Sequence, residues 1–356
     1  MESKNSPSER KHSTFFMTLL VYVWLGEKFP SWARSSLLLS RQTSGLSTLL
    51  LSSKKAGVVP EAEEQIYLDD FYTPPESVIY DYKTTKAIFR DAFWIKTTER
   101  FAVLEQYMKK YAKKSIFHAE LDNLVFNISL LGKKLDAIGS GLFCPRDSVT
   151  RGIASLIYIN NLQALGELNQ GAFSPVNNES NDMELLGRLL QNSDYFYSLP
   201  TEAALNSQSP PLWNYVRPEF AGGIFDGAAL GQFIFGIDPK NVNGPLYNGF
   251  ENENKGIDLW SLIFSMDYKK GYASVAKNGE AGIYKLYNIH LHSKLFDELI
   301  INNRFGSILD SIHEGNTTLI SVNYKGNVVI RVVRTLLGKL KSLFPVTLLS
   351  ANRRLT

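Results

Sequence analysis

The chain of 356 residues contains a single cysteine, Cys144. One cysteine cannot form an intramolecular disulfide framework, and such a chain fits a reducing compartment. No residue pattern around Cys144 would activate its thiol, so we expect a buried structural residue rather than a nucleophile. With 44% hydrophobic residues, the chain is able to bury a large core, in one large domain or in two smaller ones.

The N-terminal apolar run, 15–25, is too short to cross a membrane as a helix. It follows Lys4, Arg10 and Lys11 and thereby imitates a signal peptide, but no small-residue cleavage site comes after it. We expect a disordered leader over 1–13, a buried first strand over 15–25 and then a loop at 26–30.

Acidic residues are missing from the C-terminal end. From Asn316 onward the sequence has no acid and seven cations, Lys325, Arg331, Arg334, Lys339, Lys341, Arg353 and Arg354. This segment carries +7, so the rest of the chain carries 3 − 7 = −4. The split predicts an anionic surface as a partner of the C-terminal end.

Within this basic end, the run 328–344 has the pattern of a cationic amphipathic helix. Its valine, leucine and phenylalanine side chains fall on one side of a helix, and Arg331, Arg334, Lys339 and Lys341 fall on the other. The pattern predicts contact with an anionic membrane, and hence a cytoplasmic protein that is peripheral at the membrane and binds no nucleic acid. The alternatives are a helix packed on the domain with its charges in water, and a strand through 328–330.

Strand-like and helical patterns alternate along the chain. We expect strands over 15–25, 46–51, 116–126, 141–144 and 155–160, helices over 31–44, 99–113, 128–137 and 182–191, and a loop over 54–80. This alternation is typical of an α/β protein with a parallel sheet, whose ligands bind at the carboxyl ends of the strands.

Two carboxylates lie in the apolar run 116–126. Glu120 and Asp122 are spaced i, i+2, and on a strand that spacing puts both side chains on one face. Buried carboxylates are costly unless a cation or a hydrogen-bond donor meets them. The pair therefore predicts a divalent metal site with oxygen ligands.

Two later segments carry further candidate residues. The run 225–233 predicts a short helix with small residues, which either admit a ligand or pack tightly against another element. In 284–294, His290 and His292 alternate onto one face of a predicted strand beside Lys294. Two histidines at this spacing, in a chain with only five, are candidate metal ligands, although a lone histidine is usually structural.

Together these runs resemble motifs of the nucleotide-diphospho-sugar transferases, the glycosyltransferases with the GT-A fold. The Glu-Leu-Asp run at 120–122 is similar to their acidic D-x-D motif, and 288–294 is similar to their late histidine segment. More closely, the chain resembles transferases with the motifs His-x-Glu-x-Asp-Asn, Asn-Asp-Met, Phe-Asp-x-Ala-Ala-x-Gly-Gln and Leu-His-x-His-Ser-Lys. The resemblance covers about 15–300. It implies a Rossmann-like, mostly parallel sheet flanked by helices over 14–300, followed by a basic C-terminal extension over 301–356.

The resemblance also implies an activity and a set of site residues. The expected reaction moves a sugar from a nucleotide-diphosphate donor to a glycan or lipid-linked acceptor, with Mn²⁺ or Mg²⁺ between carboxylates and diphosphate. Asp122 is the expected first metal ligand and His292 the second. Lys294 and Gln232 are expected at the donor, Lys294 as a point charge for phosphate. Glu120 replaces the family's aspartate, so it is expected at the metal, at a metal-bound water or at the nucleotide ribose.

Two further positions complete the expected donor site. Arg100 lies at the start of the predicted helix that leads to the acidic run. It is expected to reach the sugar or the diphosphate, and the alternative is a surface ion pair. The loop 26–30, after the first strand, has the place in which this family binds the nucleotide.

Two acids compete for the role of catalytic base, which a transfer with inversion requires. Asp182, in the run 181–184, opens a predicted helix and is similar to the base of the family, but an aspartate or asparagine at that place also serves as a helix N-cap. Asp226 is the rival, facing either the donor sugar or the acceptor. These residues leave retention and inversion equally open.

Three other functions are compatible with parts of the pattern. A metal-dependent phosphoesterase would also use acids and histidines. A sugar-nucleotide pyrophosphorylase would need a glycine-rich, basic first loop, which 26–30 does not provide. A non-catalytic carbohydrate-binding relative would keep the fold without turnover.

Overall fold

The computed structural model describes residues 18–83, 92–173, 181–206, 211–235, 259–267, 270–277, 282–294 and 296, together with the strands at 320–324 and 327–331. The expected leader over 1–13 and most of the expected extension over 301–356 lie outside these residues. In the described part of the chain, no helix is both long and apolar enough to cross a membrane.

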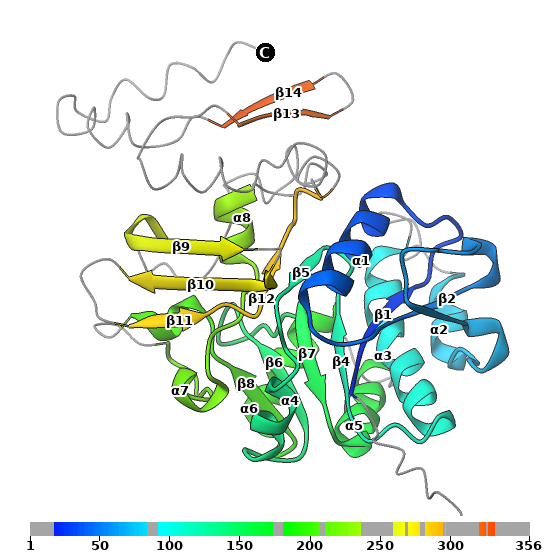
Figure 1. Ribbon diagram of the computed structural model, residues 1–356. Helices are drawn as coiled ribbons and strands as arrows, with labels where there is room; N and C mark the ends of the chain where they lie inside the picture. The colour runs from blue at the N-terminus through cyan, green and yellow to red at the C-terminus, as the bar shows by residue number, and fades with distance from the viewer. Residues whose placement is uncertain are drawn as a thin grey trace, which may run out of the picture.

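A seven-stranded sheet forms the centre of the molecule, with helices on both sides (Figure 1). The strands follow the order β3-β2-β1-β4-β7-β6-β8. Neighbours are parallel except where β7 meets β4 and β6. The bounds are β1 (Leu19–Trp24), β2 (Thr48–Ser52), β3 (Glu64–Tyr67), β4 (Ile116–Ala119), β6 (Leu142–Pro145), β7 (Leu156–Ile159) and β8 (Phe196–Leu199). The expected α/β class with a mostly parallel sheet is confirmed.

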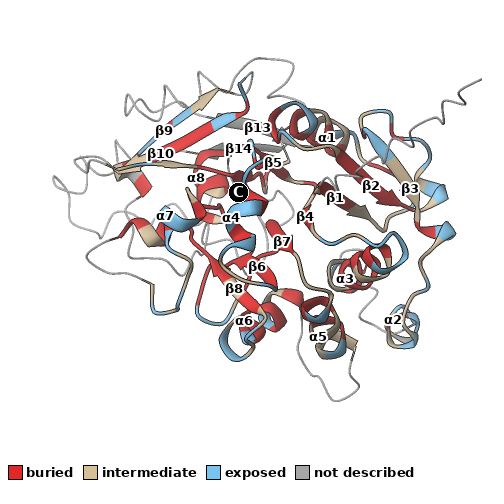
Figure 2. Ribbon diagram, turned by 60° about the horizontal axis from the view of Figure 1, so that its bottom comes forward, coloured by how far each residue is buried: buried red, intermediate tan, exposed pale blue. Residues whose placement is uncertain are grey.

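Helices cover both faces of this sheet, which explains why its inner strands are apolar on both sides. One hydrophobic cluster joins the sheet to α3 (Phe93–Lys110), α5 (Leu162–Phe173) and α6 (Asp182–Asn192). The other joins it to α1 (Ser31–Thr43) and α4 (Leu131–Asp136). Figure 2 shows the buried residues concentrated in the central strands and on the helix surfaces that face them.

The order of the strands reverses beside β1. The chain runs outward from β1 through β2 to β3, and it continues on the other side of β1 with β4. In α/β proteins, ligands bind where the strand order reverses in this way, outside the carboxyl ends of the two strands. Here those ends are Trp24 and Ala119, so the acid pair at 120–122 directly follows the place where α/β proteins have their ligand crevice.

A second layer of structure builds on the strand after the acid pair. β5 (Asn123–Val125) pairs antiparallel with β12 (Asn288–His290), and the register sets Asn123 opposite His290. The same strand is held by α1, because Ser36 and Ser40 donate hydrogen bonds to the Asn123 carbonyl at 3.2 and 3.4 Å. This pairing brings the acid pair and the late histidines together.

Several further elements lie beside this junction, and α2 (Glu76–Asp81) lies apart from it. A three-stranded antiparallel sheet contains β9 (Leu262–Asp267), β10 (Tyr272–Lys277) and β11 (Ile283–Lys285). The helices are α7 (Pro218–Ala221) and α8 (Ala229–Phe235), and α2 packs near α3.

The structure corrects three expectations about elements. The expected strand over 116–126 is two strands, because β4 belongs to the central sheet and β5 leaves it to pair with β12; Glu120 and Asp122 therefore lie in the turn between them. The expected loop over 54–80 contains β3, and α2 begins in it. Residues 284–294, expected as one strand, contain the end of β11 and the separate strand β12.

The basic C-terminal run also begins differently from the expectation. β14 (Asn327–Arg331) pairs antiparallel with β13 (Ile320–Tyr324), so the start of the predicted helix over 328–344 is a strand. Val328, Val329 and Ile330 are β-branched and favour extended backbone, which was the alternative for 328–330. The rest of the run, 332–344, lies outside the described residues.

The packing of α6 yields a test of the fold. A Cβ on Gly187 would lie 1.9 Å from the backbone oxygen of Thr150, whereas a Cβ on Gly166 in α5 would meet nothing closer than 3.7 Å. Gly187→Ala should lower the free energy of unfolding by about 1–3 kcal/mol or more. Gly166→Ala, the matched control, should leave it unchanged or raise it by up to about 1 kcal/mol. Urea denaturation of both variants measures the difference, and equal effects would contradict this packing.

Candidate active site

Three potential metal ligands converge at the carboxyl end of β4. The side chains of Glu120, Asp122 and His290 each offer one ligand atom, and these atoms all lie within 4.8 Å of one another. His290 Nε2 is 3.2 Å from Asp122 Oδ1 and 3.3 Å from Glu120 Oε2. An ion with bonds of about 2.0–2.6 Å has ligand atoms about 3 Å apart, so this spacing suits a divalent cation. We call these residues the acid–histidine triad.

The turn between β4 and β5 places the two carboxylates. The Glu120 amide donates to the Ser155 carbonyl at 3.1 Å, and the Asn123 amide closes the turn by donating to the Glu120 carbonyl at 3.1 Å. The Leu291 amide donates to the Asp122 carbonyl at 2.6 Å. Both acids are thus anchored through their backbones, and their side chains remain directed to His290.

A buried hydrogen-bond network orients His290. Its Nδ1 donates to the Gly227 carbonyl at 2.8 Å, which leaves Nε2 for the triad. Its backbone N–H donates to Asp226 Oδ2 at 2.8 Å. The Asp226 carboxylate also accepts from the Leu230 and Gly231 amides at 3.0 and 2.7 Å. Asp226 therefore joins the start of α8 to the backbone of His290.

The charges of the triad are strongly coupled. Burial opposes protonation of His290, but the carboxylates of Asp122 and Glu120 outweigh it and raise the pKa of His290 to about 9. Burial also opposes ionisation of Asp122, but His290 and Lys294 hold the pKa of Asp122 well below its usual range. At neutral pH the triad therefore carries a proton on His290 that a metal ion would have to displace.

Lys294 adds a second cation beside Asp122. Its Nζ lies 3.2 Å from Asp122 Oδ2 and 5.5 Å from the ring centre of Trp32. Its backbone is in the left-handed region, with φ of 58°, which costs a non-glycine residue about 1 kcal/mol or more. The chain thus turns sharply after β12 and brings this ammonium group back to the acids.

His292 has a different position from the one expected. Its ring centre lies 4.0 Å from that of His290, and among the described residues its buried Nε2 has no hydrogen-bond partner. Burial and the positive charge of His290 hold the pKa of His292 well below its usual value. The histidine in the triad is His290, because β12 ends at His290 and the chain turns after it. The role of His292 as the second metal ligand stays a prediction.

Arg100 links the triad to α6 through buried ion pairs. Its guanidinium lies 2.5 Å from Glu120 Oε1 and 2.6 Å from Asp182 Oδ2. Burial opposes its charge, but the two carboxylates outweigh this and raise the pKa of Arg100. Since Arg100 takes one oxygen of Glu120, the other oxygen faces His290. The alternative of a surface ion pair is wrong, because Arg100 is 7% exposed.

Asp182 is part of the same chain of charges. Its Oδ1 accepts from Thr97 Oγ1 at 3.3 Å, and its other oxygen is held by Arg100. Burial raises the pKa of Asp182, and the charge of Arg100 works against that rise. The N-cap of α6 is Asn181, whose side chain accepts from the Glu184 amide at 3.0 Å. The expected N-cap at this place is therefore confirmed for the asparagine, and Asp182 is the first residue of the helix.

The other expected site residues lie around this arrangement. Gln232 lies partly buried in α8, and the catalytic roles of Asp182 and Asp226 stay predictions, since protein groups engage both carboxylates. The loop 26–30 follows β1, beside which the strand order reverses. Cys144 is fully buried and burial raises its thiol pKa, as expected for a structural residue.

Sequence reasoning missed the residues that support the site. Thr97 and Trp32 lie in helices whose sequence patterns give no sign of a functional site. Their contacts with Asp182 and Lys294 join residues that are far apart in the chain, so only the tertiary structure reveals them. Asn288 donates to Asn123 Oδ1 at 2.8 Å and to the Asp226 carbonyl at 2.9 Å. Its position two residues before His290 was the available signal, because outer-shell amides commonly neighbour metal ligands.

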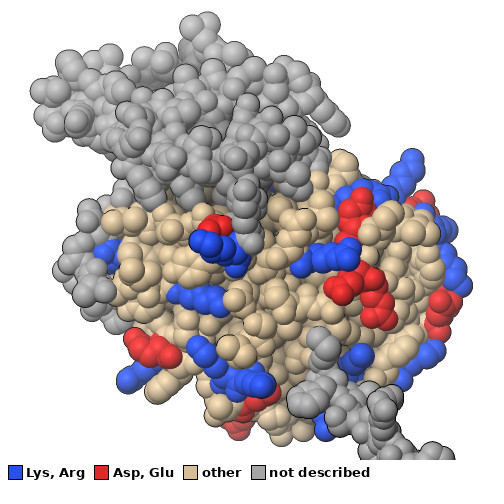
Figure 3. Space-filling view, in the orientation of Figure 1, with Lys and Arg blue, Asp and Glu red and all other residues tan. Residues whose placement is uncertain are grey.

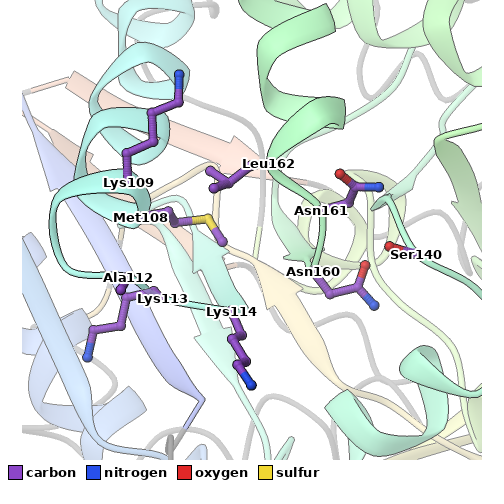
Figure 4. Close-up of a pocket in the computed structure, with 9 residues that line it drawn as sticks. All are labelled: Met108, Lys109, Ala112, Lys113, Lys114, Ser140, Asn160, Asn161 and Leu162. Atoms are coloured by element: carbon purple, nitrogen blue, oxygen red, sulfur yellow. The ribbon is translucent and has the colours of Figure 1, made fainter.

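A shallow cavity of about 530 Å³ lies away from the triad. Lys113 and Lys114, which line it with Asn160 and Asn161, precede the amino end of β4 (Figure 4). The triad follows the carboxyl end of that strand. The cavity is therefore not part of the candidate active site.

Comparison with known proteins adds the following likenesses. No protein-family model matches the chain, and no curated protein matches it. Mouse xyloside xylosyltransferase 1 in its apo form aligns with 52% of this chain and 85% of its own, at 11% identity and a TM-score of 0.36. The galactosyltransferase LgtC, in a complex with donor and acceptor sugar analogues, aligns over 48% and 70%, at 11% identity and a TM-score of 0.28. GlyE, a glycosyltransferase of Streptococcus pneumoniae, aligns over 54% and 47%, at 17% identity and a TM-score of 0.27. These likenesses are too weak to indicate a function, so any functional conclusion depends on the residues of this chain itself.

Mn²⁺ binding should depend on pH through His290. Because its pKa is about 9, a proton competes with the metal below that value, and affinity should rise as the pH increases from about 6 to about 9, by up to about tenfold per unit. Isothermal titration with Mn²⁺ at several pH values measures this. Asp122→Asn should abolish binding, whereas Asp70→Asn, in an exposed ion pair with Lys54, should not. Binding that ignores pH, or survives in Asp122→Asn, contradicts the triad.

Loss of Arg100 should destabilise the fold, because its buried carboxylate partner loses its counter-charge. Arg100→Gln leaves the Asp182 carboxylate without its cation, which should lower the free energy of unfolding by about 3–5 kcal/mol at neutral pH. Since burial raises the pKa of Asp182, the acid takes up a proton as the pH falls, and the loss should shrink toward acid pH. Urea denaturation across pH measures the loss. Arg100→Lys keeps the charge and should lose less; a penalty independent of pH would count against the pairing.

Proposed function

We propose that this chain is a metal-dependent glycosyltransferase that takes a sugar from a nucleotide-diphosphate donor. The observation that supports it most is the position of the acid–histidine triad. Two carboxylates and an imidazole lie at the carboxyl end of β4, next to the place beside β1 where α/β proteins bind ligands. The motif resemblance over 15–300 supports the same reaction.

The donor set suits Mn²⁺ or Mg²⁺. Carboxylate oxygens are the ligands that both ions prefer, and the added imidazole favours Mn²⁺ over Mg²⁺. A bound ion would neutralise the charge that grows on the diphosphate as it leaves. Glu120, Asp122 and His290 would hold this ion, each through one atom.

The neighbouring residues would act on the donor and on the ligands. Lys294, 3.2 Å from Asp122, would turn to the diphosphate once the ion neutralises that acid. Arg100 would hold Glu120 Oε1 through its 2.5 Å contact, so that only Oε2 is available to the ion. Gly227 and Asp226 would keep His290 Nε2 directed at the ion through the Nδ1 and amide hydrogen bonds. The loop 26–30 would bind the nucleotide.

The acceptor in this proposal is a glycan or a lipid-linked sugar. A base is needed only if the transfer inverts the anomeric centre. Asp182 would serve only if Arg100 and Thr97 released it, and Asp226 only if α8 and His290 moved away, because each carboxylate is now engaged.

The test is metal-dependent release of nucleoside diphosphate from a panel of nucleotide sugars, with and without glycan acceptors. At least one donor should give release that needs Mn²⁺ or Mg²⁺ and stops in excess chelator. Asp122→Asn should lower the rate by about a hundredfold or more, since it removes a ligand. The control Asp70→Asn should retain full activity.

Other outcomes of this test would identify other functions. Hydrolysis of simple phosphoesters without release from any nucleotide sugar would replace the proposal with a phosphoesterase. Metal-dependent donor binding without turnover, in the presence of every acceptor tried, would indicate a non-catalytic sugar-nucleotide-binding protein.

A further inference from the structure

Three large apolar side chains are exposed on adjacent elements away from the triad. Leu130, just before α4, is 66% exposed, Phe220 in α7 is 64% exposed, and Ile283 in β11 is 72% exposed. Single exposed apolar residues are ordinary on a protein surface. A set of them on neighbouring elements indicates contact with another apolar phase.

Cations stand among these apolar residues. Lys133 and Lys134 are exposed on α4, Arg217 is exposed at the start of α7, and Lys285 is half-buried in β11. Among the described residues, no carboxylate forms an ion pair with any of the four. The acids nearby are Glu219, which is exposed, and Asp136, which accepts hydrogen bonds from Tyr158 and Asn160. The surface is therefore net positive.

Contacts between the elements make this one continuous surface. Lys134 Nζ lies 2.0 Å from the position that a Cβ on Gly222 would take, just after α7. Lys285 Nζ donates to the Asn127 carbonyl at 2.6 Å, three residues before Leu130. Ile224 bridges to Leu286, which aligns the end of α7 with β11. Figure 3 shows lysine and arginine side chains on this side of the molecule, where Figure 1 draws α4, α7 and β11.

Lys134 also acts electrostatically on Lys285. Burial lowers the pKa of Lys285, and the charge of Lys134 lowers it further. Like charges held close together repel, and an anionic partner would relieve this repulsion. We call the surface of Leu130, Lys133, Lys134, Arg217, Phe220, Ile283 and Lys285 the basic–apolar face.

We propose that the basic–apolar face docks on an anionic lipid surface. The cations match the charge of anionic headgroups, and the exposed leucine, phenylalanine and isoleucine match the boundary between headgroups and acyl chains. A soluble polyanion would use the cations but not the apolar side chains. This docking does not depend on the proposed function, and it involves the folded domain rather than the C-terminal run 328–344.

Vesicle co-sedimentation of the full-length chain tests the proposal. The chain should bind phosphatidylcholine vesicles that contain phosphatidylglycerol, and it should not bind vesicles of phosphatidylcholine alone. Lys133→Glu with Lys134→Glu should weaken the partitioning by about tenfold or more. The matched control is Lys113→Glu with Lys114→Glu, which makes the same change in net charge after the end of α3 and should leave binding nearly intact.

A second pair of variants tests the apolar part of the face. Phe220→Ser should weaken vesicle binding several-fold without altering the melting temperature, since the ring is 64% exposed. Leu212→Ser, at a leucine that is 91% exposed outside the basic–apolar face, should have no effect on binding. Circular dichroism of each variant checks the fold.

Four results would overturn the proposal. Absence of binding to anionic vesicles removes it, and equal losses in the two lysine pairs would reduce it to a non-specific charge effect. Loss of binding in Arg334→Glu with Lys339→Glu, but not in the α4 pair, would assign membrane contact to the C-terminal run instead. Binding to heparin that depends on Lys133 and Lys134, with no effect of Phe220→Ser on vesicles, would indicate a soluble polyanion.

Discussion

The buried guanidinium of Arg100 is the group on which the site depends. It stands between Glu120 and Asp182, at 2.5 and 2.6 Å, and it is 7% exposed. Asp182 is 3% exposed, and a carboxylate this deeply buried is tolerated only with a cation or donors nearby. Without Arg100, the acid after β4 and the acid at the start of α6 would repel each other. One side chain from α3 thus allows two acidic elements to meet at the end of the sheet.

A similar balance of charge continues across the triad. Asp122 lies between the protonated His290 and Lys294, whose positive charges offset the acids. A divalent ion would take over this role and release the proton of His290 and the ammonium of Lys294. The site's own cations thus stabilise its acids, and under the proposed function a metal ion and the diphosphate of the donor would replace them.

Rigidity comes from the backbone around the triad rather than from the ligands themselves. Asp226 accepts three N–H groups, one of them from His290, and Asn288 joins Asn123 to the Asp226 carbonyl. A Cβ on Gly231 would lie 1.9 Å from the His290 carbonyl, so α8 and β12 are in direct backbone contact. These contacts explain how a short strand pair holds His290 in a fixed position.

The sequence by itself determined the local elements and the chemical character of the site. The start signal at Pro30 and Ser31 and the end signal at Ser44 and Gly45 predicted α1, and the alternation of strands and helices predicted the mostly parallel sheet. The acids at 120 and 122, next to an apolar strand, predicted the centre of the site. These inferences depend on residues close in the chain, where periodicity and burial act directly.

Only the tertiary structure decided which groups meet. Asn123 and Asn288, the residues joined between β5 and β12, are 165 positions apart, and no local pattern specifies that register. This register selected His290 rather than His292, and the packing of α3 against the sheet gave Arg100 two acids as partners. Similarly, the strand over 116–126 divides at the acids because β5 pairs with β12 and not within the central sheet. Pairing between distant segments is decided by the whole core, which a single sequence does not reveal.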